Sequence, residues 1–358
     1  VLIVDDSALV RKLLTELLSS DSRIEVCGTA SDPIAARSKI KQLNPDVLTL
    51  DVEMPKMDGV TFLRNLMRLR PMPVVMVSTL TEKGADITFQ ALELGAVDFV
   101  AKPKVDLQES IKSYRDEIIE KVIAASMAKV DAISPNLIKK TTESVAAKNC
   151  ANSVLAKSAS KSHFKTTDKL IAIGSSTGGT EAVKVVLAGM SPDSPAVVIS
   201  QHIPEAFSGP FAARANSVSP LEVSEAKDGI QLLPGHAYIA PGNRHLLVKR
   251  DGARFVCHLY DGEPVNRHIP SVDVMFRSVA NNIGPNAISV LLTGMGADGV
   301  EGMNEMRAAG APTIAQDEAT SVVWGMPGEA VKRGYVDTVL PIDKIAGSLL
   351  NWYRRETK

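Results

Sequence analysis

The sequence is poor in cysteine, and its three cysteines form no pattern. Cys27, Cys150 and Cys257 are scattered through 358 residues. Their odd number and wide separation match neither the spacing of a zinc site nor the framework of a disulfide-stabilised secreted domain. We therefore expect reduced thiols in a cytosolic protein.

Long apolar runs and an excess of one charge are also missing. No run approaches the roughly 18 apolar residues of a membrane span. The start VLIVDDSALV does not resemble a signal peptide, because its four apolar residues lead into two aspartates, and we expect a short N-terminal piece to precede Val1. The formal net charge of -1 argues against nucleic-acid binding through bulk charge. We predict no membrane insertion and no nucleic-acid partner.

The charge that is present divides the chain into three segments. Residues 1–122 have a net charge of -3, residues 123–165 of +5, and residues 166–358 of -3. The middle segment is rich in alanine, serine and lysine and contains no glycine, which is typical of a linker. We expect a helix from about Asp106 to Met127 before it. The sequence therefore predicts two domains joined by a linker.

Both outer segments alternate short apolar runs with amphipathic stretches, which predicts an α/β fold with two doubly wound parallel-sheet domains. We expect a five-stranded, flavodoxin-like first domain, with one helical face carrying Leu9, Val10, Leu13, Leu14, Leu17 and Leu18. The second domain is predicted to be larger and Rossmann-like, with buried strands LIAIGS, AVVISQ and AISVLLTG. Between the last two, AYIAP, HLLVKR and RFVCHL are separated by GN and DG turns, which predicts an inserted antiparallel hairpin over about 234–259.

Acidic residues follow the predicted strands of the first segment. Asp5 and Asp6 follow the first strand and Asp51 the third, while Ser78 and Lys102 end the fourth and fifth. Each aspartate alone is most simply a helix N-cap. Because the carboxyl ends of parallel strands meet at one edge, we expect a shared cleft. Repulsion between its carboxylates and the oxygen-only ligand set favour Mg²⁺, and the whole group is suited to accept a phosphoryl group.

This segment resembles the receiver domain of two-component response regulators over 1–122. The matching pieces are Asp5-Asp6, D-x-x-M-P-x-M-D-G from Asp51 to Gly59, Ser78-Thr79 and Lys102-Pro103. The resemblance implies that Asp51 is phosphorylated by a histidine kinase. It also implies that Asp5, Asp6, Asp51 and the Glu53 backbone hold Mg²⁺, and that Ser78 and Lys102 sense the phosphoryl group.

The turn Gly174-Ser175-Ser176-Thr177-Gly178-Gly179 in the third segment is compatible with several sites. A dinucleotide site requires G-x-G-x-x-G and a later acidic residue, and this turn has neither. A P-loop requires a lysine, which is also absent from the turn. The fragment G-x-S-x-G fits a nucleophile elbow, although a glycine-rich helix cap explains it equally well in isolation. His202 ends the next predicted strand and Asp298 follows AISVLL, so a base and a carboxylate are expected beside Ser176. His268 is the one competing histidine.

The order Ser, His, Asp differs from the Ser, Asp/Glu, His order of α/β hydrolases. It is similar to that of the CheB-type methylesterase domain over about 166–350. The matching stretches are IAIGSSTGGTEA, SQHIPEAF, LPGHAYIAPGNRHL, VNRHIPSVDVMF, LLTGMGADGVEGM and TIAQDEATSVVWGMP. The family more often has alanine where Ser175 stands. The resemblance implies a triad of Ser176, His202 and Asp298, with Thr177 in support and the Met295 backbone N–H in an oxyanion hole.

Together the two resemblances imply a phosphorylation-activated chemotaxis methylesterase. Its substrates would be glutamate methyl esters, and glutamines that it deamidates, on cytoplasmic helices of methyl-accepting chemoreceptors. Its phosphodonor would be a chemotaxis histidine kinase. Ester hydrolysis would need no cofactor, and the unphosphorylated receiver would inhibit the catalytic domain. Two other hypotheses remain open at this point: a receiver with a DNA-binding output, and a nucleotide-binding or degraded module that acts through protein contacts.

Overall fold

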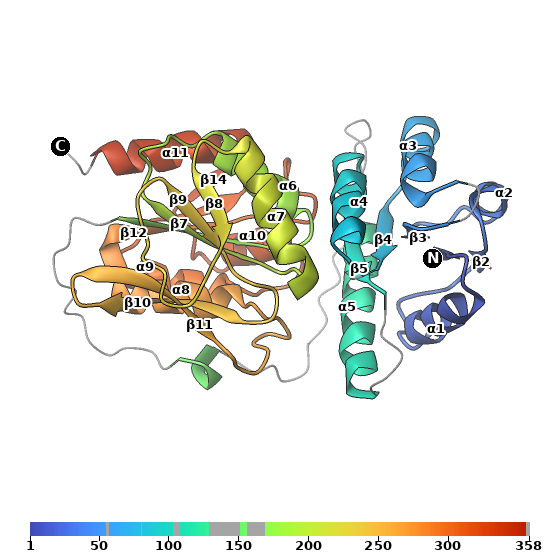
Figure 1. The fold of residues 1–358 in the computed structure, drawn as a ribbon, viewed down its shortest axis with the longest axis horizontal. Coiled ribbons are helices and arrows are strands. Elements are labelled where there is room, and N and C mark those ends of the chain that lie inside the picture. Colours follow the sequence, from blue (N-terminus) through green and yellow to red (C-terminus); the bar gives the residue numbers. More distant parts are fainter. Residues whose placement is uncertain (55–56, 80, 103–107, 129–150, 156–168, 356–358) are drawn as a thin grey trace. The chain divides into compact units, whose positions relative to one another are not determined.

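The computed structural model describes residues 1–54, 57–79, 81–102, 108–128, 151–155 and 169–355. The chain forms two compact units, Val1–Leu137 and Ile138–Lys358 (Figure 1), and each is described by itself. Most of the predicted linker 123–165 lies outside the described residues, as do Pro55 and Pro103 of the receiver-like motifs. No helix in the described ranges combines the length and the hydrophobicity that crossing a bilayer requires.

The first unit is built on a five-stranded sheet with the strand order β2-β1-β3-β4-β5. Every pairing is parallel, which confirms the predicted fold class. This order places the switch point of a flavodoxin-like sheet between β1 and β3. The strands are β1 (Leu2–Val4), β2 (Gly28–Ala30), β3 (Leu48–Asp51), β4 (Val74–Ser78) and β5 (Asp98–Ala101).

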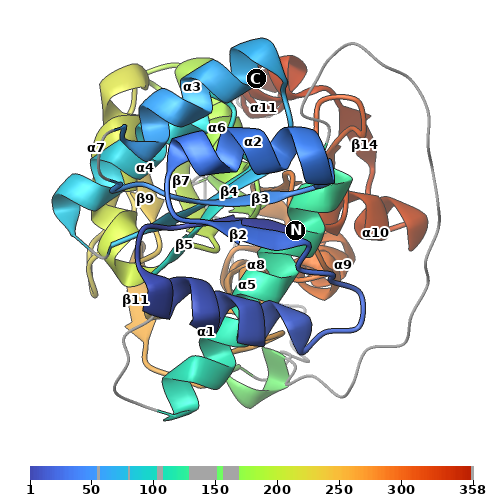
Figure 2. The same ribbon diagram turned by 90° about the vertical axis from the view of Figure 1, so that its right-hand side faces the viewer.

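Helices cover both faces of this sheet, with α1 and α5 on one side and α2, α3 and α4 on the other (Figure 2). Ser7, Asp32, Asp58 and Thr81 cap four of them by accepting hydrogen bonds from first-turn amides. Leu14, Leu17 and Leu18 face the core, but Leu9 is 62% exposed, because it lies roughly 140° round the helix from Leu14. The helices are α1 (Ala8–Ser19), α2 (Pro33–Leu43), α3 (Gly59–Leu69), α4 (Glu82–Glu93) and α5 (Gln108–Met127).

The second unit has a seven-stranded sheet with the order β14-β13-β12-β6-β7-β9-β8, and all its pairings are parallel. The chain switches sides between β6 and β12, as in a doubly wound fold. The strands are β6 (Leu170–Ser175), β7 (Ala196–Gln201), β8 (Glu222–Glu225), β9 (His236–Ile239), β12 (Ala287–Leu291), β13 (Thr313–Gln316) and β14 (Thr338–Leu340).

The predicted hairpin is present, but it is shorter than expected. Strands β10 (His245–Asp251) and β11 (Arg254–Tyr260) pair antiparallel in a sheet of their own. The stretch AYIAP, predicted from the sequence to belong to the hairpin, instead forms β9 between β7 and β8 of the parallel sheet. Its residues Ala237, Tyr238 and Ile239 are all buried, and burial of consecutive residues is typical of an inner parallel strand rather than a half-exposed hairpin.

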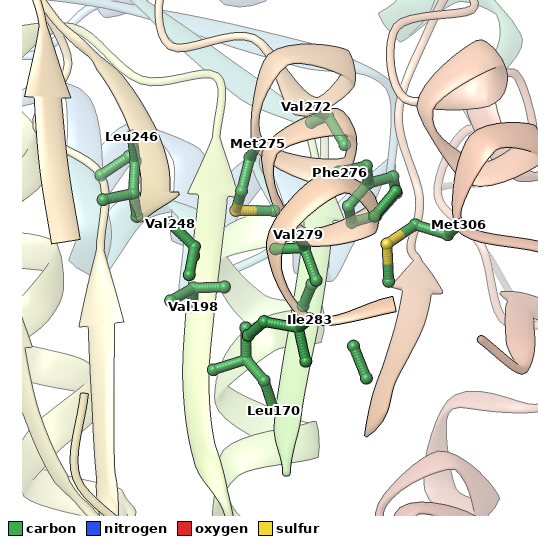
Figure 3. Close-up of a cluster of buried hydrophobic side chains, with 14 of the residues drawn as sticks. Leu170, Val198, Leu246, Val248, Val272, Met275, Phe276, Val279, Ile283 and Met306 are labelled. Carbon is green, nitrogen blue, oxygen red and sulfur yellow. The ribbon is translucent and has the colours of Figure 1, made fainter. Parts of the chain in front are cut away.

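The core of the second unit surrounds helix α8, which packs between the hairpin and the parallel sheet. Figure 3 shows Met275 and Val279 of this helix on the side of Leu246 and Val248 of the hairpin and Val198 of β7, and Phe276 on the other side, beside Met306. Figure 1 shows α6, α7 and α11 on the other face of the sheet. The helices are α6 (Gly179–Ala188), α7 (Glu205–Val218), α8 (Val272–Asn282), α9 (Val300–Ala308), α10 (Met326–Lys332) and α11 (Ile342–Arg355), with 3₁₀ turns η1 (Ala151–Ser153) and η2 (Gly284–Asn286).

Residues 151–155, within the predicted linker, pack against α8. Arg277 Nη1 donates to Asn152 Oδ1 at 2.7 Å and to the Leu155 carbonyl at 2.8 Å. The same guanidinium forms a two-point ion pair with Glu305, at 2.7 and 2.6 Å, and both side chains are largely buried. This short segment is therefore fastened to the helix at the centre of the second unit.

Candidate functional site

Three carboxylates gather at the carboxyl end of the first sheet. Oxygen atoms of Asp5, Asp6 and Asp51 all lie within 4.8 Å of one another. Lys102, which follows β5, places its Nζ 2.8 Å from Asp51 Oδ2 and 3.4 Å from Asp5 Oδ2. Apart from this ammonium, the two Oδ2 atoms have no hydrogen-bond partner in the described part of the chain, although both are buried.

Burial strongly perturbs this carboxylate cluster. It raises the pKa of Asp51 from its ordinary value of 3.8 to about 6, with the charge of Asp5 adding to the effect and Lys102 opposing it. Burial also raises the pKa of Asp5. Buried oxygen ligands with too little positive charge beside them suit a hard divalent cation, so the residues present fit Mg²⁺.

The other predicted receiver residues surround this cluster. Ser78 ends β4, is fully buried, and donates to the Gly84 carbonyl at 3.3 Å. Its own carbonyl accepts from the Lys102 amide at 2.6 Å, which joins the ends of β4 and β5. The Glu53 amide donates to Asp51 Oδ1 at 3.2 Å, while its side chain is exposed. The sheet thus brings Asp5, Asp51 and Lys102 into direct contact.

In the second unit, the turn after β6 presents Ser176 at the carboxyl end of the sheet. Its amide donates to the Thr293 carbonyl at 3.0 Å, and α6 begins three residues later. Gly178 has a φ of +76°, a backbone conformation that residues other than glycine rarely adopt. A Cβ atom at Gly174 would lie 2.2 Å from Val272 Cγ1. Both glycines of G-x-S-x-G are therefore required by the turn and its packing.

Ser176, His202 and Asp298 form a continuous hydrogen-bonded chain. His202 Nδ1 lies 3.1 Å from Ser176 Oγ, and His202 Nε2 lies 2.8 Å from Asp298 Oδ2. The three residues follow β6, β7 and β12, which are neighbours in the sheet. An ionised Asp298 accepts the Nε2 proton, so the neutral imidazole has its free lone pair at Nδ1, facing the serine.

Asp298 is only 2% exposed and is surrounded by hydrogen-bond donors. Besides His202, it accepts from the Val272 amide at 2.6 Å, from Ser271 Oγ at 2.8 Å and from Asn266 Nδ2 at 2.8 Å. Burial works against the charged form, but these bonds and the charges of the nearby histidines hold the pKa of Asp298 well below its usual range. Asp298 is therefore ionised at neutral pH.

The sequence did not reveal the partners of Asp298. Ser271 and Val272 belong to the N-cap and first turn of α8, and Asn266 lies in the loop before it. Helix N-termini attract carboxylates, and the stretch S-V-D before an apolar helix is a recognisable N-terminal signal. Nothing in that signal indicates which carboxylate the helix end would face.

The competing histidine, His268, also lies at this site. Its ring stacks on that of His202 with the centroids 3.7 Å apart and an interplanar angle of 11°. The chain brings both histidines together, but His202 is the one bonded to Ser176 and Asp298. His236 and His258 instead pair with Glu222 and Asp228.

The loop after β12 lies against the serine. A Cβ atom at Gly294 would come within 2.7 Å of Ser176 Cβ, so only glycine permits this approach, and Met295 follows it directly. Thr177 is buried, and its carbonyl accepts from Thr293 Oγ1 at 2.9 Å. These contacts hold Gly294, the residue before Met295, against the turn that carries Ser176.

Comparisons with known proteins match both units. The CheB methylesterase family model matches residues 171–349, and the response regulator receiver domain model matches residues 1–113. A protein-glutamate methylesterase/protein-glutamine glutaminase from Hydrogenovibrio crunogenus is 58% identical over 370 residues, covering 98% of this chain and 97% of the relative. A protein of the same name from Xanthomonas euvesicatoria is 59% identical over 350 residues, covering 98% and 96%.

Among solved structures, the CheB methylesterase catalytic domain of Thermotoga maritima is 37% identical, with a TM-score of 0.51. The match covers 52% of this chain and all of that domain. The alignments with the two relatives named above each cover 98% of this chain and so extend over both units. The chain therefore belongs to the CheB methylesterase family, with a response regulator receiver domain at its N-terminal side.

Proposed function

We propose that this CheB-family methylesterase and glutaminase hydrolyses glutamate methyl esters on the cytoplasmic helices of methyl-accepting chemoreceptors, using a triad of Ser176, His202 and Asp298. The observation that carries the proposal is the chain of contacts at 3.1 and 2.8 Å that joins serine, imidazole and a buried, ionised carboxylate. This arrangement of nucleophile, base and orienting carboxylate is the one that acyl transfer requires.

In the first half of the reaction, Ser176 Oγ attacks the ester carbonyl carbon while its proton passes to His202 Nδ1. Asp298 stabilises the resulting imidazolium through Nε2. The carbonyl oxygen becomes an oxyanion, which the Met295 backbone N–H is proposed to stabilise, with Thr177 supporting the turn. Collapse of this intermediate breaks the bond to the methoxy group, which leaves as methanol with the proton from His202.

In the second half, water attacks the glutamyl ester on Ser176 and gives its proton to Nδ1. The same proton then returns to Oγ, releasing the glutamic acid side chain, which loses its remaining carboxyl proton to solvent and becomes a carboxylate. Glutamine would follow the same route with ammonia as the leaving group. An amide is the poorer substrate because its nitrogen is the poorer leaving group, so we expect deamidation to be slower than demethylation.

We propose that a chemotaxis histidine kinase is the phosphodonor for Asp51, with Asp5, Asp6, Asp51 and the Glu53 backbone holding Mg²⁺. Bound there, the cation would neutralise charge on the transferring phosphoryl group. Ser78 and Lys102 would sense the group by hydrogen bonding and charge. Both the kinase and the receptor helices imply a cytoplasmic location.

The proposed regulation is inhibition of the catalytic domain by the unphosphorylated receiver. The proposed limits are a receiver at 1–122, a linker at 123–165 and a catalytic domain at 166–358. Support comes from the fusion of a phosphorylatable unit to a serine hydrolase in one chain. We expect a small phosphodonor with Mg²⁺ to raise methanol release by the full chain, and Asp51→Asn to remove that increase. A response that persists in Asp51→Asn would contradict this assignment.

The triad is tested by labelling with a fluorophosphonate probe and by methanol release from methylated receptor membranes. Ser176→Ala should lose both, whereas Ser175→Ala, at the neighbouring serine, should be labelled normally. Phosphorylation of Asp51 should continue in both variants, which shows that the receiver is intact. Methanol release by Ser176→Ala at the parental rate would exclude the proposed nucleophile.

A further inference from the structure

We propose that Asn266 and Asp273 are positioning residues for the reaction, because together they fix Asp298 in the orientation that serves His202. The proposal rests on the triad proposed above and extends it to two residues that act through Asp298. It follows from the way in which a single side-chain amide is shared between two buried carboxylates.

The Asn266 amide bridges Asp298 and Asp273. Its Nδ2 atom donates to Asp298 Oδ1 at 2.8 Å and to Asp273 Oδ2 at 2.7 Å. An NH₂ group has two hydrogens, so each carboxylate receives one of them. Rotating the amide would break at least one of these bonds, and Asp273 therefore holds Asn266 in the orientation that Asp298 needs.

Asp273 is itself held in place by the helices around it. It is 4% exposed, and its Oδ1 accepts from the Gly302 amide of α9 at 2.6 Å. Its backbone N–H points to Asp298 Oδ1 at 3.4 Å. No lysine or arginine forms an ion pair with Asp273 among the described residues. Asp273 thus connects the amide of Asn266 to the contact between α8 and α9.

The two carboxylates differ in how many donors surround them, and this difference places the negative charge. Within the described residues, Asp298 accepts hydrogen bonds from His202, from side chains and from a backbone amide, while the carboxyl oxygens of Asp273 have two donors. Burial and the charge of Asp298 raise the pKa of Asp273. Asp298, whose pKa is lowered, is therefore the more readily ionised of the two groups, and Asp273 supports it through the Asn266 amide.

The backbone at Asn266 is shaped for this role. Asn266 and Arg267 have φ values of +53° and +74°, and asparagine is among the residues that most readily adopt this region. The two successive left-handed residues turn the chain between the Asn266 amide and His268, which stacks on His202. The loop thus holds one side chain against the carboxylate and another against the base.

The test measures the rate at which a fluorophosphonate labels Ser176 in the full-length chain across a pH series, alongside kcat and KM for methanol release. Asn266→Gly removes the amide but tolerates the positive φ, so it isolates the side chain from the backbone. In metal sites, loss of a partner that orients a ligand typically lowers activity by about 10–100-fold, and we use the same range for a partner that orients Asp298. We expect labelling and kcat to fall within that range while KM stays unchanged.

The pH profile separates positioning from a structural role. The titratable groups that face the pair are His202 at the end of β7, His268 in the loop, His245 on β10 and Glu301 on α9. Without the Asn266 donor, Asp298 holds the shared proton of the His202–Asp298 pair more tightly. The acid limb of the labelling profile should therefore move to higher pH, which a loss of stability alone would not produce.

Asn282→Ala is the matched control. Asn282 lies at the other end of α8 and also donates from Nδ2 to two oxygens, the carbonyls of Val248 and Ser278. We expect it to label at the parental rate with an unshifted profile. Asp273→Asn is the second variant, for use if Asn266→Gly fails to fold. Its new NH₂ group would face the NH₂ group of Asn266 or the Gly302 amide, both of which are donors, so it should break the bridge and slow labelling.

The outcomes distinguish this proposal from the triad on which it rests. Parental labelling rates and profiles in both Asn266→Gly and Asp273→Asn, with no labelling of Ser176→Ala, would overturn the positioning role and leave the triad intact. Labelling of Ser176→Ala would overturn the triad itself. The proposal would be supported by slower labelling with a shifted acid limb in Asn266→Gly and Asp273→Asn, together with parental labelling in Asn282→Ala.

Discussion

Replacing Asp51 by asparagine removes a charge that the first unit buries unfavourably. We therefore expect Asp51→Asn to be more stable than the parent chain at neutral pH in Mg²⁺-free buffer. The Asp51 side chain is fully buried, and burial, the largest cause, raises its pKa from 3.8 to about 6. A functional carboxylate that weakens its own domain is expected where binding, rather than stability, has determined the residue.

The magnitude follows from the shift in pKa. Because the folded unit holds the proton more tightly than the unfolded chain, the parent loses stability as pH rises from 3.8 to about 6. A shift of about 2 units corresponds to about 3 kcal/mol as an upper limit. Asparagine also loses the 2.8 Å ion pair with Lys102, so we expect a net gain of about 1–2 kcal/mol at neutral pH.

Hydrogen exchange of the β3 and β4 amides, corrected for intrinsic rates, reports this unit separately from the second. In EDTA, the advantage of Asp51→Asn should grow by about 2 kcal/mol between about pH 4.5 and pH 7. Mg²⁺ should reduce it, because a ligand stabilises the form that binds it more tightly. A difference independent of pH, or a less stable Asp51→Asn at neutral pH without Mg²⁺, would refute the reasoning.

Asp58→Asn is the control in the same unit. Asp58 caps α3, and although burial opposes it, hydrogen bonds from Thr61 lower its pKa. A carboxyl whose pKa is lowered by folding stabilises the folded state at pH values above its pKa in the unfolded chain, and this stabilisation is lost as pH falls. Asp58→Asn should therefore show the opposite dependence on pH, with no gain in stability at neutral pH.

Three further predictions concern the second unit. Arg277→Met should destabilise it by about 3–5 kcal/mol, because it leaves the buried Glu305 carboxylate without its partner; replacing both residues by methionine should recover most of the loss in a urea titration. Gly179→Ala should lower both stability, by about 1–3 kcal/mol, and the rate of serine labelling, since the added Cβ would lie 2.2 Å from Gln201 Oε1. Phe276→Ala should reduce the unfolding free energy by about 3–5 kcal/mol through a cavity beside α8; a loss under about 1 kcal/mol would show that the core collapses to fill it.

The sheets and the reactive residues at their edges were predictable from local patterns. Buried parallel strands are continuous apolar runs, and the residue that follows each run must lie at the carboxyl edge. Position after a strand is therefore enough to predict Asp5, Asp51, Ser176, His202 and Asp298 as residues of the two edges. The same reasoning failed for β9, because a short apolar run beside glycine-rich turns has the same pattern in a hairpin and in a parallel sheet.

The residues that support the site were not predictable in the same way. Asn266 and Asp273 follow no strand of the sheet, and their role depends on where a loop and α8 meet Asp298. The ring orientation of His202, with Nδ1 toward the serine, likewise depends on tertiary geometry. Contacts between segments about 30 residues apart, such as Asn266 with Asp298, leave no periodicity in the sequence.

The close approach of α9 to α8 has a consequence for genetics. Gly302 is buried where the two helices meet: a Cβ atom there would lie 2.7 Å from Phe276 Cβ and 3.0 Å from Asp273 Cα, and its amide is the donor to Asp273. A random mutagenesis screen for receptors that stay methylated should recover substitutions at position 302 together with those at Ser176. Inactivating substitutions would then map not only to the residues that react but also to the contact between α8 and α9.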